Sequence, residues 1–159
     1  MKKRKAYKPK QVNPMAWKVA VMGQCKLSEH DQEQFAAPVV LAVDNVRKGV
    51  ASKADWQAIF DVANMLDTFS KMPKVMQNAT DYVRSLQNQI ERILNRQKQT
   101  GAKALYPGEL ADLNDMVDLW KEVLSVVTMA EYLQCQEKTH DRIVRALRNE
   151  SSAIVVEAP

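Results

Sequence analysis

Apolar residues recur at three- and four-residue steps along most of this chain, and this period limits its fold more than any other feature. The clearest run follows Ser52 and comprises Trp56, Ile59, Phe60, Ala63, Leu66 and Phe69. Such spacing places apolar side chains on one face of an α-helix. No segment longer than four residues alternates apolar and polar residues, and no Asn-Gly or Asp-Gly hairpin signal occurs. The sequence therefore predicts an all-α protein, an antiparallel bundle of five or six helices.

Capping signals set the predicted helix boundaries. Three pairs have the spacing of a capping box: Ser28 with Asp31, Ser52 with Asp55, and Thr128 with Glu131. We expect helices over about 14–23, 29–49, 53–72, 74–100 and 109–148. Pro38 lies inside the second of these, so we expect a kink or a break near residues 36–37. The segment 109–148 fits either two helices with a break near 125–128 or one continuous helix.

These helices are predicted to form a single domain over residues 14–149, between an extended basic arm (1–13) and a flexible or extended tail (150–159). The expected core positions include Val39, Val43, Val46, Val50, Val83, Leu86, Ile90, Ile93, Leu113, Trp120, Leu124, Leu133, Ile143, Val144 and Leu147. The spacing over 79–93 is close to a heptad seam but lasts only two heptads, which favours packing within the bundle over a dimerising coiled coil. A homodimer stays open.

The formal net charge of +4 is unevenly distributed. Residues 1–28 contain eight of the 23 Lys and Arg residues and no acidic residue, so the other 15 basic residues share the rest of the chain with all 19 acidic ones. A basic segment at one end is typical of proteins that contact a polyanion such as nucleic acid, anionic lipid or an acidic protein surface. A merely solubilising tail is the simpler alternative.

The start of the chain does not resemble a secretory signal, because prolines and lysines interrupt any apolar stretch. The longest apolar run, Phe35–Val43, has nine residues and contains Pro38, whereas a membrane span needs about 18. We therefore expect a cytoplasmic protein with no membrane contact. In a reducing compartment Cys25 and Cys135 are expected to be free thiols, each a small core residue.

Basic residues on the predicted final helix are the best candidates for a binding surface on the body. Lys138, Arg142 and Arg145 lie one turn apart there, although interleaved acidic residues also fit an ordinary solvated surface. A second basic stripe, Arg84, Arg92 and Arg96, runs along the predicted helix over 74–100. The candidate polyanion-binding residues are Lys2, Lys3, Arg4, Lys5, Tyr7, Lys8, Lys10, Lys138, Arg142 and Arg145. Any nucleic-acid contact is expected to be mainly to the backbone and blind to sequence.

Little in the sequence points to catalysis or a cofactor. The only cysteines and histidines form the pairs Cys25-x4-His30 and Cys135-x4-His140, which is a legitimate zinc ligand set in composition. On a helix, however, residues i and i+5 point about 140° apart, so two core thiols and two surface imidazoles are the favoured interpretation. Asp61-x-x-Asn64 could bind a metal in principle, but capping or packing is simpler. We expect no enzyme activity, no metal and no cofactor.

Three stretches resemble a group of small accessory proteins encoded by phages and prophages of Gram-negative bacteria. They are residues 2–15 (KKRKAYKPKQVNPM), 46–65 (VRKGVASKADWQAIFDVANM) and 96–113 (RQKQTGAKALYPGELADL). The resemblance implies a phage-encoded protein that acts in the host cytoplasm by binding host machinery, and it transfers no functional residue. Two functions follow as expectations. The first is a non-catalytic protein that engages nucleic acid or a host nucleoprotein complex through its basic arm. The alternative is a protein inhibitor of a host complex, such as a defence or nucleic-acid-processing system, that acts through a helical face.

Overall fold

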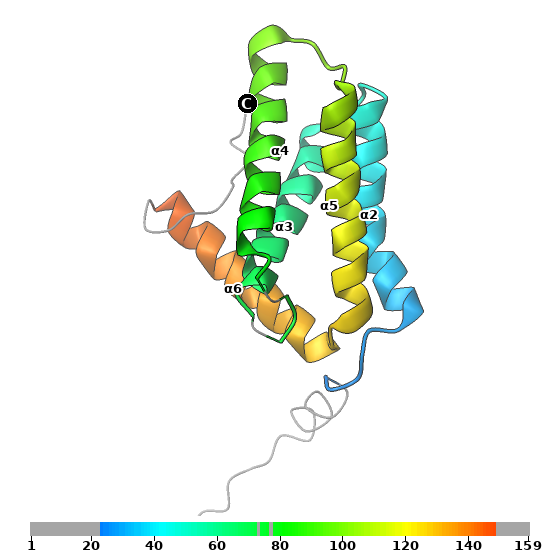
Figure 1. Cartoon of the computed structure of the whole chain (residues 1–159), viewed down its shortest axis with the longest axis vertical. Helices are drawn as coiled ribbons and strands as arrows, with labels where there is room; N and C mark the ends of the chain where they lie inside the picture. Colours follow the sequence, from blue (N-terminus) through cyan, green and yellow to red (C-terminus); the bar gives the residue numbers. More distant parts are fainter. Residues whose placement is uncertain (1–22, 73, 77, 149–159) are drawn as a thin grey trace, which may run out of the picture.

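The computed structural model describes residues 23–72, 74–76 and 78–148, and five helices account for most of them (Figure 1). These are α2 (Glu29–Arg47), α3 (Lys53–Ser70), α4 (Thr80–Thr100), α5 (Pro107–Val126) and α6 (Met129–Leu147). Within the described part the fold is an all-α bundle, as the sequence predicts. The predicted arm (1–13), nearly all of the predicted helix over 14–23, and the tail (150–159) lie outside the described residues.

The predicted capping pairs begin three of the helices. Ser28, Ser52 and Thr128 each accept a hydrogen bond from the backbone N–H three residues on, and the carboxylate at that position accepts one from the capping residue's own N–H. These reciprocal bonds satisfy helix N–H groups that would otherwise have no partner. At the other end of α2, Gly49 adopts a left-handed φ of 71°, and the N–H of Val50 donates to the carbonyl of Asn45 at 3.0 Å, which completes a Schellman motif.

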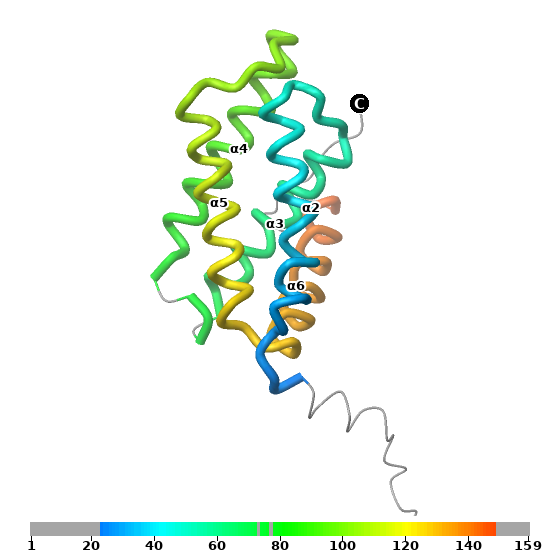
Figure 2. Tube along the Cα trace, turned by 90° about the vertical axis from the view of Figure 1, so that its right-hand side faces the viewer, coloured from blue at the N-terminus to red at the C-terminus, as the bar shows by residue number. Residues whose placement is uncertain are grey.

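Helix α3 is the centre of the molecule. It packs against α2, α4, α5 and α6, whereas α6 packs mainly against α3 and reaches α2 and α5 through Tyr132 near its start. Successive helices α2 to α5 run in alternating directions along the long axis, and α6 crosses the outside of this bundle obliquely (Figures 1 and 2). Every residue of α3 from Val62 to Ser70 is buried, polar ones included.

An aromatic cluster joins the helices around α3. Trp120 of α5 lies 6.2 Å from Phe69 and 6.4 Å from Tyr132 between ring centroids, and Phe35 stacks on Tyr132 at 4.3 Å. The indole N–H of Trp120 donates to the Phe35 carbonyl at 3.2 Å, so this large side chain is buried with its polar atom satisfied. These contacts link α2, α3, α5 and α6 in one core.

The chain before α2 is fastened to the turn between α5 and α6. The carbonyl of Gly23 accepts from the N–H of Ala130 at 2.9 Å, and the N–H of Leu27 donates to the carbonyl of Val127 at 3.2 Å. Lys26 and Thr128 form an isolated antiparallel bridge within this contact. The described chain therefore starts beside the N-terminal end of α6.

Several predicted helix limits need correction. α2 continues through Pro38 without a break, because Ala36 and Val39 on either side are buried, and this packing offsets the ~3 kcal/mol that an interior proline costs. α4 begins at Thr80 rather than near 74, because Asn78 adopts a left-handed φ of 58° that no α-helix contains. α5 begins at Pro107 rather than 109, since proline fits the first helical position. The segment 109–148 is two helices, with the break at the predicted place.

Four residues expected in the core are exposed. Val50 follows the end of α2 and is 65% exposed. Leu133 and Leu147 of α6 are 45% and 65% exposed, because α6 packs mainly on α3 and buries only the narrow face of Tyr132, Cys135 and Thr139. Cys25 is exposed as well, since it lies in the turn and bend that precede α2. Cys135 is fully buried, as expected.

Candidate polyanion-binding site

The three basic residues predicted on the final helix gather at one cavity. Lys138, Arg142 and Arg145 of α6 line a cavity of about 250 Å³ together with Asp141 and, from the α3 side, Thr68, Lys71 and Met72. The steps of four and three residues place the α6 cations on one helical face. A fourth cation, Lys71, joins them from the other side because α6 packs on the C-terminal part of α3.

A second cavity continues the first. It measures about 470 Å³ and shares Lys71, Met72 and Lys138 with its neighbour, while Lys74, Glu131 and Gln134 complete its lining. We call the two cavities together the α3–α6 groove. Glu131 is committed to the α6 capping box, where it accepts from the N–H and hydroxyl of Thr128 at 2.9 and 3.0 Å. The groove therefore has a predominantly cationic lining.

Asp67, a buried carboxylate of α3, holds two of the groove cations in place. Its side chain is 5% exposed and accepts from the Lys71 ammonium at 2.8 Å and from the Arg142 guanidinium. The other terminal nitrogen of Arg142 donates to the Thr68 hydroxyl at 3.0 Å. The Arg142 side chain is only 19% exposed. Burial and hydrogen bonds fix its orientation.

Behind these cations the polar side chains between α3 and α6 are mutually satisfied. Thr139 donates to the Thr68 hydroxyl at 2.8 Å, and Thr68 donates to the Asn64 carbonyl at 3.1 Å. The Cys135 thiol lies 3.4 Å from the Met65 carbonyl, and its burial raises its pKa to about 12. Among the described residues no buried side-chain nitrogen or oxygen lacks a hydrogen-bond partner. This network makes the floor of the groove rigid.

Lys138 and Arg145 form the solvent-accessible part of the groove. Both are exposed, and no carboxylate of the described residues forms an ion pair with either. Asp141 is the one acidic residue in the lining of the smaller cavity. Neither side chain therefore has to break an ion pair with a described carboxylate before it can contact an anion.

The sequence prediction missed Lys71, Lys74 and Asp67. Lys71 lies four residues after Asp67, a spacing that favours an ion pair on a helix. This spacing does not indicate that Arg142, from another helix, pairs with the same carboxylate. A buried polar pair, Asp67 and Thr68, within an apolar stripe was the signal available in the sequence. The arm residues Lys2, Lys3, Arg4, Lys5, Tyr7, Lys8 and Lys10 lie outside the described residues.

The basic stripe of α4 does not form a comparable site. Arg84 and Arg92 are exposed, but Arg96 donates to both oxygens of Glu109 at 2.8 and 2.6 Å and lies 4.4 Å from the ring centre of Tyr106. The hydrogen bonds to Glu109 raise the pKa of Arg96. This arginine therefore ties α4 to the start of α5.

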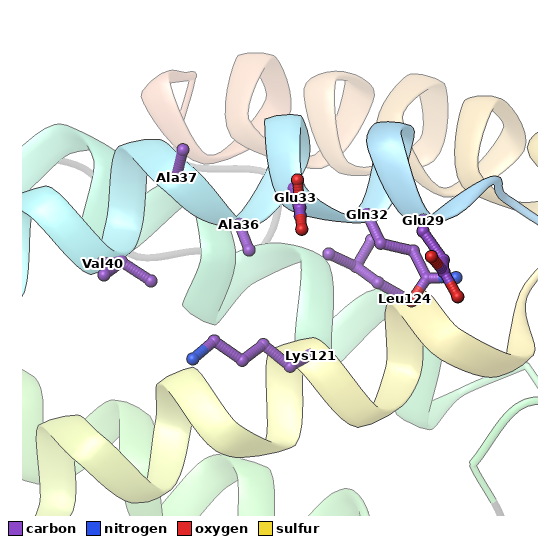
Figure 3. A pocket seen from close by; sticks show the side chains of 8 residues that line it. All are labelled: Glu29, Gln32, Glu33, Ala36, Ala37, Val40, Lys121 and Leu124. Atoms are coloured by element: carbon purple, nitrogen blue, oxygen red, sulfur yellow. The ribbon is translucent and has the colours of Figure 1, made fainter.

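A separate cavity of about 430 Å³ lies between α2 and α5. Ala36, Ala37 and Val40 of α2 and Leu124 of α5 give it apolar walls (Figure 3). Glu29, Gln32 and Glu33 line one end, while the Lys121 side chain extends along α5 toward Val40. We call this the α2–α5 groove. Its lining is apolar and mildly acidic, in contrast to the α3–α6 groove.

The residues weighed as metal ligands take ordinary structural roles. His30 is exposed and shares a hydrogen bond with Gln34 at 3.0 Å, and His140 is exposed too. Asn64 is buried, whereas Asp61 is exposed and accepts from Gln57 at 2.8 Å. Across residues 23–72, 74–76 and 78–148, no three His, Cys, Asp or Glu side chains are grouped so that they could hold a metal ion.

Comparison with protein-family models, with curated proteins and with solved structures gives no match. None of these comparisons bears on the phage setting that the sequence resemblance implies. None of the described helices is long and apolar enough to cross a membrane.

Proposed function

We propose that this protein is a non-catalytic accessory protein that binds nucleic acid, free or in a nucleoprotein complex, through phosphate contacts. The observation that carries the proposal is the convergence of Lys138, Arg142 and Arg145 with Lys71 around one cavity. Convergence of cations from two helices raises the local positive potential above that of a mixed surface. We therefore assign the phosphate contacts of the body to this surface.

The spacing of the groove cations suits a nucleic-acid strand. Lys138 and Arg145 are seven residues apart on α6, which corresponds to about 10 Å at 1.5 Å per residue. One strand of a duplex presents about three phosphates over such a length. The sequence carries no recognisable recognition-helix signature, so binding is expected to be blind to sequence.

The basic arm adds a second set of cations to the same function. The described chain begins at the α5–α6 turn, beside the N-terminal end of the helix that carries the groove cations. The 22 residues before it can span at most about 70 Å, which covers the whole length of α6. Arm and groove can therefore contact one strand together. We place this activity in a host-cell cytoplasm, the setting that the phage resemblance implies.

Fluorescence anisotropy with labelled duplex DNA, single-stranded DNA and RNA tests the proposal. We expect binding whose logarithm falls linearly with the logarithm of salt concentration. Replacing Lys71, Lys138 and Arg145 by Gln should weaken binding and reduce the slope by about 3 on duplex DNA. A control variant loses three exposed charges outside the groove through Lys53→Gln, Arg84→Gln and Arg92→Gln. Equal losses in the two variants would show only an effect of net charge and would overturn the groove assignment.

The contribution of the arm is measured separately. Replacing its six Lys and Arg residues between positions 2 and 10 by Gln should reduce the salt slope on duplex DNA by about 5. An unchanged slope would remove the arm from the proposal. Failure of the intact protein to bind any of the three nucleic acids would overturn the proposed function itself.

The α2–α5 groove favours the alternative, a protein inhibitor of a host complex. Val40 and Leu41 of α2 are 40% and 60% exposed beside the apolar walls of this groove, and exposed aliphatic residues next to a recess are typical of protein interfaces. The test is capture of a stoichiometric partner from nuclease-treated host lysate. Capture of the partner should be lost with Val40→Arg and retained when Lys71, Lys138 and Arg145 of the α3–α6 groove are replaced by Gln. The opposite pattern would exclude this face.

A further inference from the structure

The smaller cavity of the α3–α6 groove is a recess rather than a flat basic patch. Its volume of about 250 Å³ equals that of about eight water molecules. Thr68 is 4% exposed and the Arg142 side chain 19% exposed, whereas Lys138 and Arg145 are exposed. A ligand that reaches all four must enter the recess. A phosphate inside a strand is flanked by backbone on both sides, but one at a strand end is attached on one side only.

The charge of the recess matches a phosphomonoester better than a phosphodiester. Its four cations, Lys71, Lys138, Arg142 and Arg145, face two carboxylates, Asp141 in the lining and Asp67 beneath it, which leaves two positive charges. A phosphomonoester carries a charge of about −1.5 to −2 near pH 7. A phosphodiester carries a single negative charge and would leave part of the positive charge uncompensated.

We infer that this recess binds the terminal phosphomonoester of a nucleic-acid strand. The inference rests on the proposed function and names the part of the nucleic acid that the site selects. Lys138, Arg145 and the half-exposed Lys71 contact the phosphate from the solvent side, while the Thr68–Arg142 pair forms its inner wall.

Asp67 prepares the inner wall for this ligand. Because it holds both Lys71 and Arg142, their side chains are ordered before a phosphate arrives. Ordering long side chains in advance lowers the entropy cost of binding. Asp67 is therefore a positioning residue, and it contacts the cations rather than the phosphate.

The experiment compares single-stranded DNA oligonucleotides of one sequence that differ only at their ends: 5′-phosphate, 3′-phosphate, or hydroxyl at both ends. Each is labelled internally, and binding to the full chain is measured by anisotropy at 0.15 M salt. We expect at least one phosphorylated form to bind about tenfold more tightly than the hydroxyl form, a difference expected from extra charge-assisted hydrogen bonds. Equal affinities for all three would overturn the inference and leave the proposed function standing. No binding of any of them, or of RNA and duplex DNA, would overturn both.

Substitutions then assign the preference to the recess. Arg145→Gln should remove most of the preference for the phosphorylated end, and so should Arg142→Gln if circular dichroism shows it folded. The exposed Arg92→Gln on α4 removes the same charge elsewhere and should keep the preference. A preference that survives Arg145→Gln, or disappears equally with Arg92→Gln, contradicts the assignment. Competition separates the sources of the phosphate group: tighter binding of a phosphoserine peptide than of the phosphorylated oligonucleotide would overturn the strand-end assignment.

Discussion

At the scale of single residues, Asp67 is a buried carboxylate that pairs with two cations. It lies in the buried half of α3 and contacts cations from α3 and α6 at once. A buried charge is tolerated only when partners replace its lost hydration, and here Lys71 and Arg142 do so. The same residue therefore serves stability and, in our proposal, the order of the phosphate site.

Removing the Asp67 carboxylate should destabilise the fold more than removing an exposed one. We expect Asp67→Ala to lower the free energy of unfolding by about 3 kcal/mol, because the largely shielded Arg142 loses its carboxylate. The exposed Asp61→Ala on the same helix should change it by less than about 0.5 kcal/mol. Urea unfolding followed by circular dichroism measures both. Combining Asp67→Leu with Arg142→Met should restore much of the loss, and equal effects of the two alanine variants would contradict this account.

The two cysteines should differ in reactivity. Burial raises the pKa of the Cys135 thiol to about 12 and blocks access to it, whereas Cys25 is exposed. At pH 8 a thiol reagent such as 5,5′-dithiobis(2-nitrobenzoate) should modify one cysteine rapidly in the native protein and both in denaturant. A Cys25→Ser variant should show almost no rapid phase. Two fast equivalents in the native protein would mean that α6 separates readily from α3.

At the scale of helices, the capping boxes give measurable increments. Thr128→Ala removes the side chain that caps α6 and should cost about 1 kcal/mol of unfolding free energy. Ser85→Ala, at an exposed interior position of α4, should cost nothing or stabilise slightly. Chemical denaturation of the two variants beside the wild type measures the difference. A neutral Thr128→Ala would mean that packing against α3 alone determines where α6 begins.

The box of α3 also has a pH signature. Hydrogen bonds from the backbone N–H and the hydroxyl of Ser52, with a further one from Asn45, lower the pKa of Asp55 below its ordinary 3.8. A carboxyl with a lower pKa in the folded state stabilises the fold above its unfolded pKa, and this contribution is lost as pH falls through the folded pKa. Stability should therefore decrease between pH 5 and pH 2. Asp55→Asn should make that decrease smaller. An identical pH profile of stability for the variant and the wild type would contradict the role of these hydrogen bonds.

Local sequence signals predicted the helices well, and they failed where distant parts of the chain decide the outcome. Ser28, Ser52 and Thr128 determine helix starts through hydrogen bonds to residues within four positions, so the sequence alone predicted these helix starts. The burial expected for Leu147 was wrong, because this side chain would be buried only if another helix covered that face. α4 is shorter than predicted because Asn78 adopts a left-handed conformation, which the apolar spacing does not encode.

At the scale of the whole molecule, half of the candidate site was predictable. Lys138, Arg142 and Arg145 share a helical face by spacing alone. Their meeting with Lys71 depends on the docking of α6 onto α3, a contact between segments about 70 residues apart. No local pattern encodes that pairing, so the recess could not be inferred from the sequence, although the polar pair Asp67 and Thr68 within an apolar stripe was a signal of its floor.

The position of α3, surrounded by four other helices, determines which part of the chain opens last. Backbone amides of residues 62–70 can meet solvent only when the surrounding helices separate, so their exchange with deuterium requires global unfolding. Amides of α6, which packs on the outside of the bundle and mainly against α3, can exchange after that helix alone detaches. Mass spectrometry of deuterium uptake should find α3 slowest and α6 faster, and a phosphorylated oligonucleotide bound in the α3–α6 groove should bring the rate of α6 closer to that of α3.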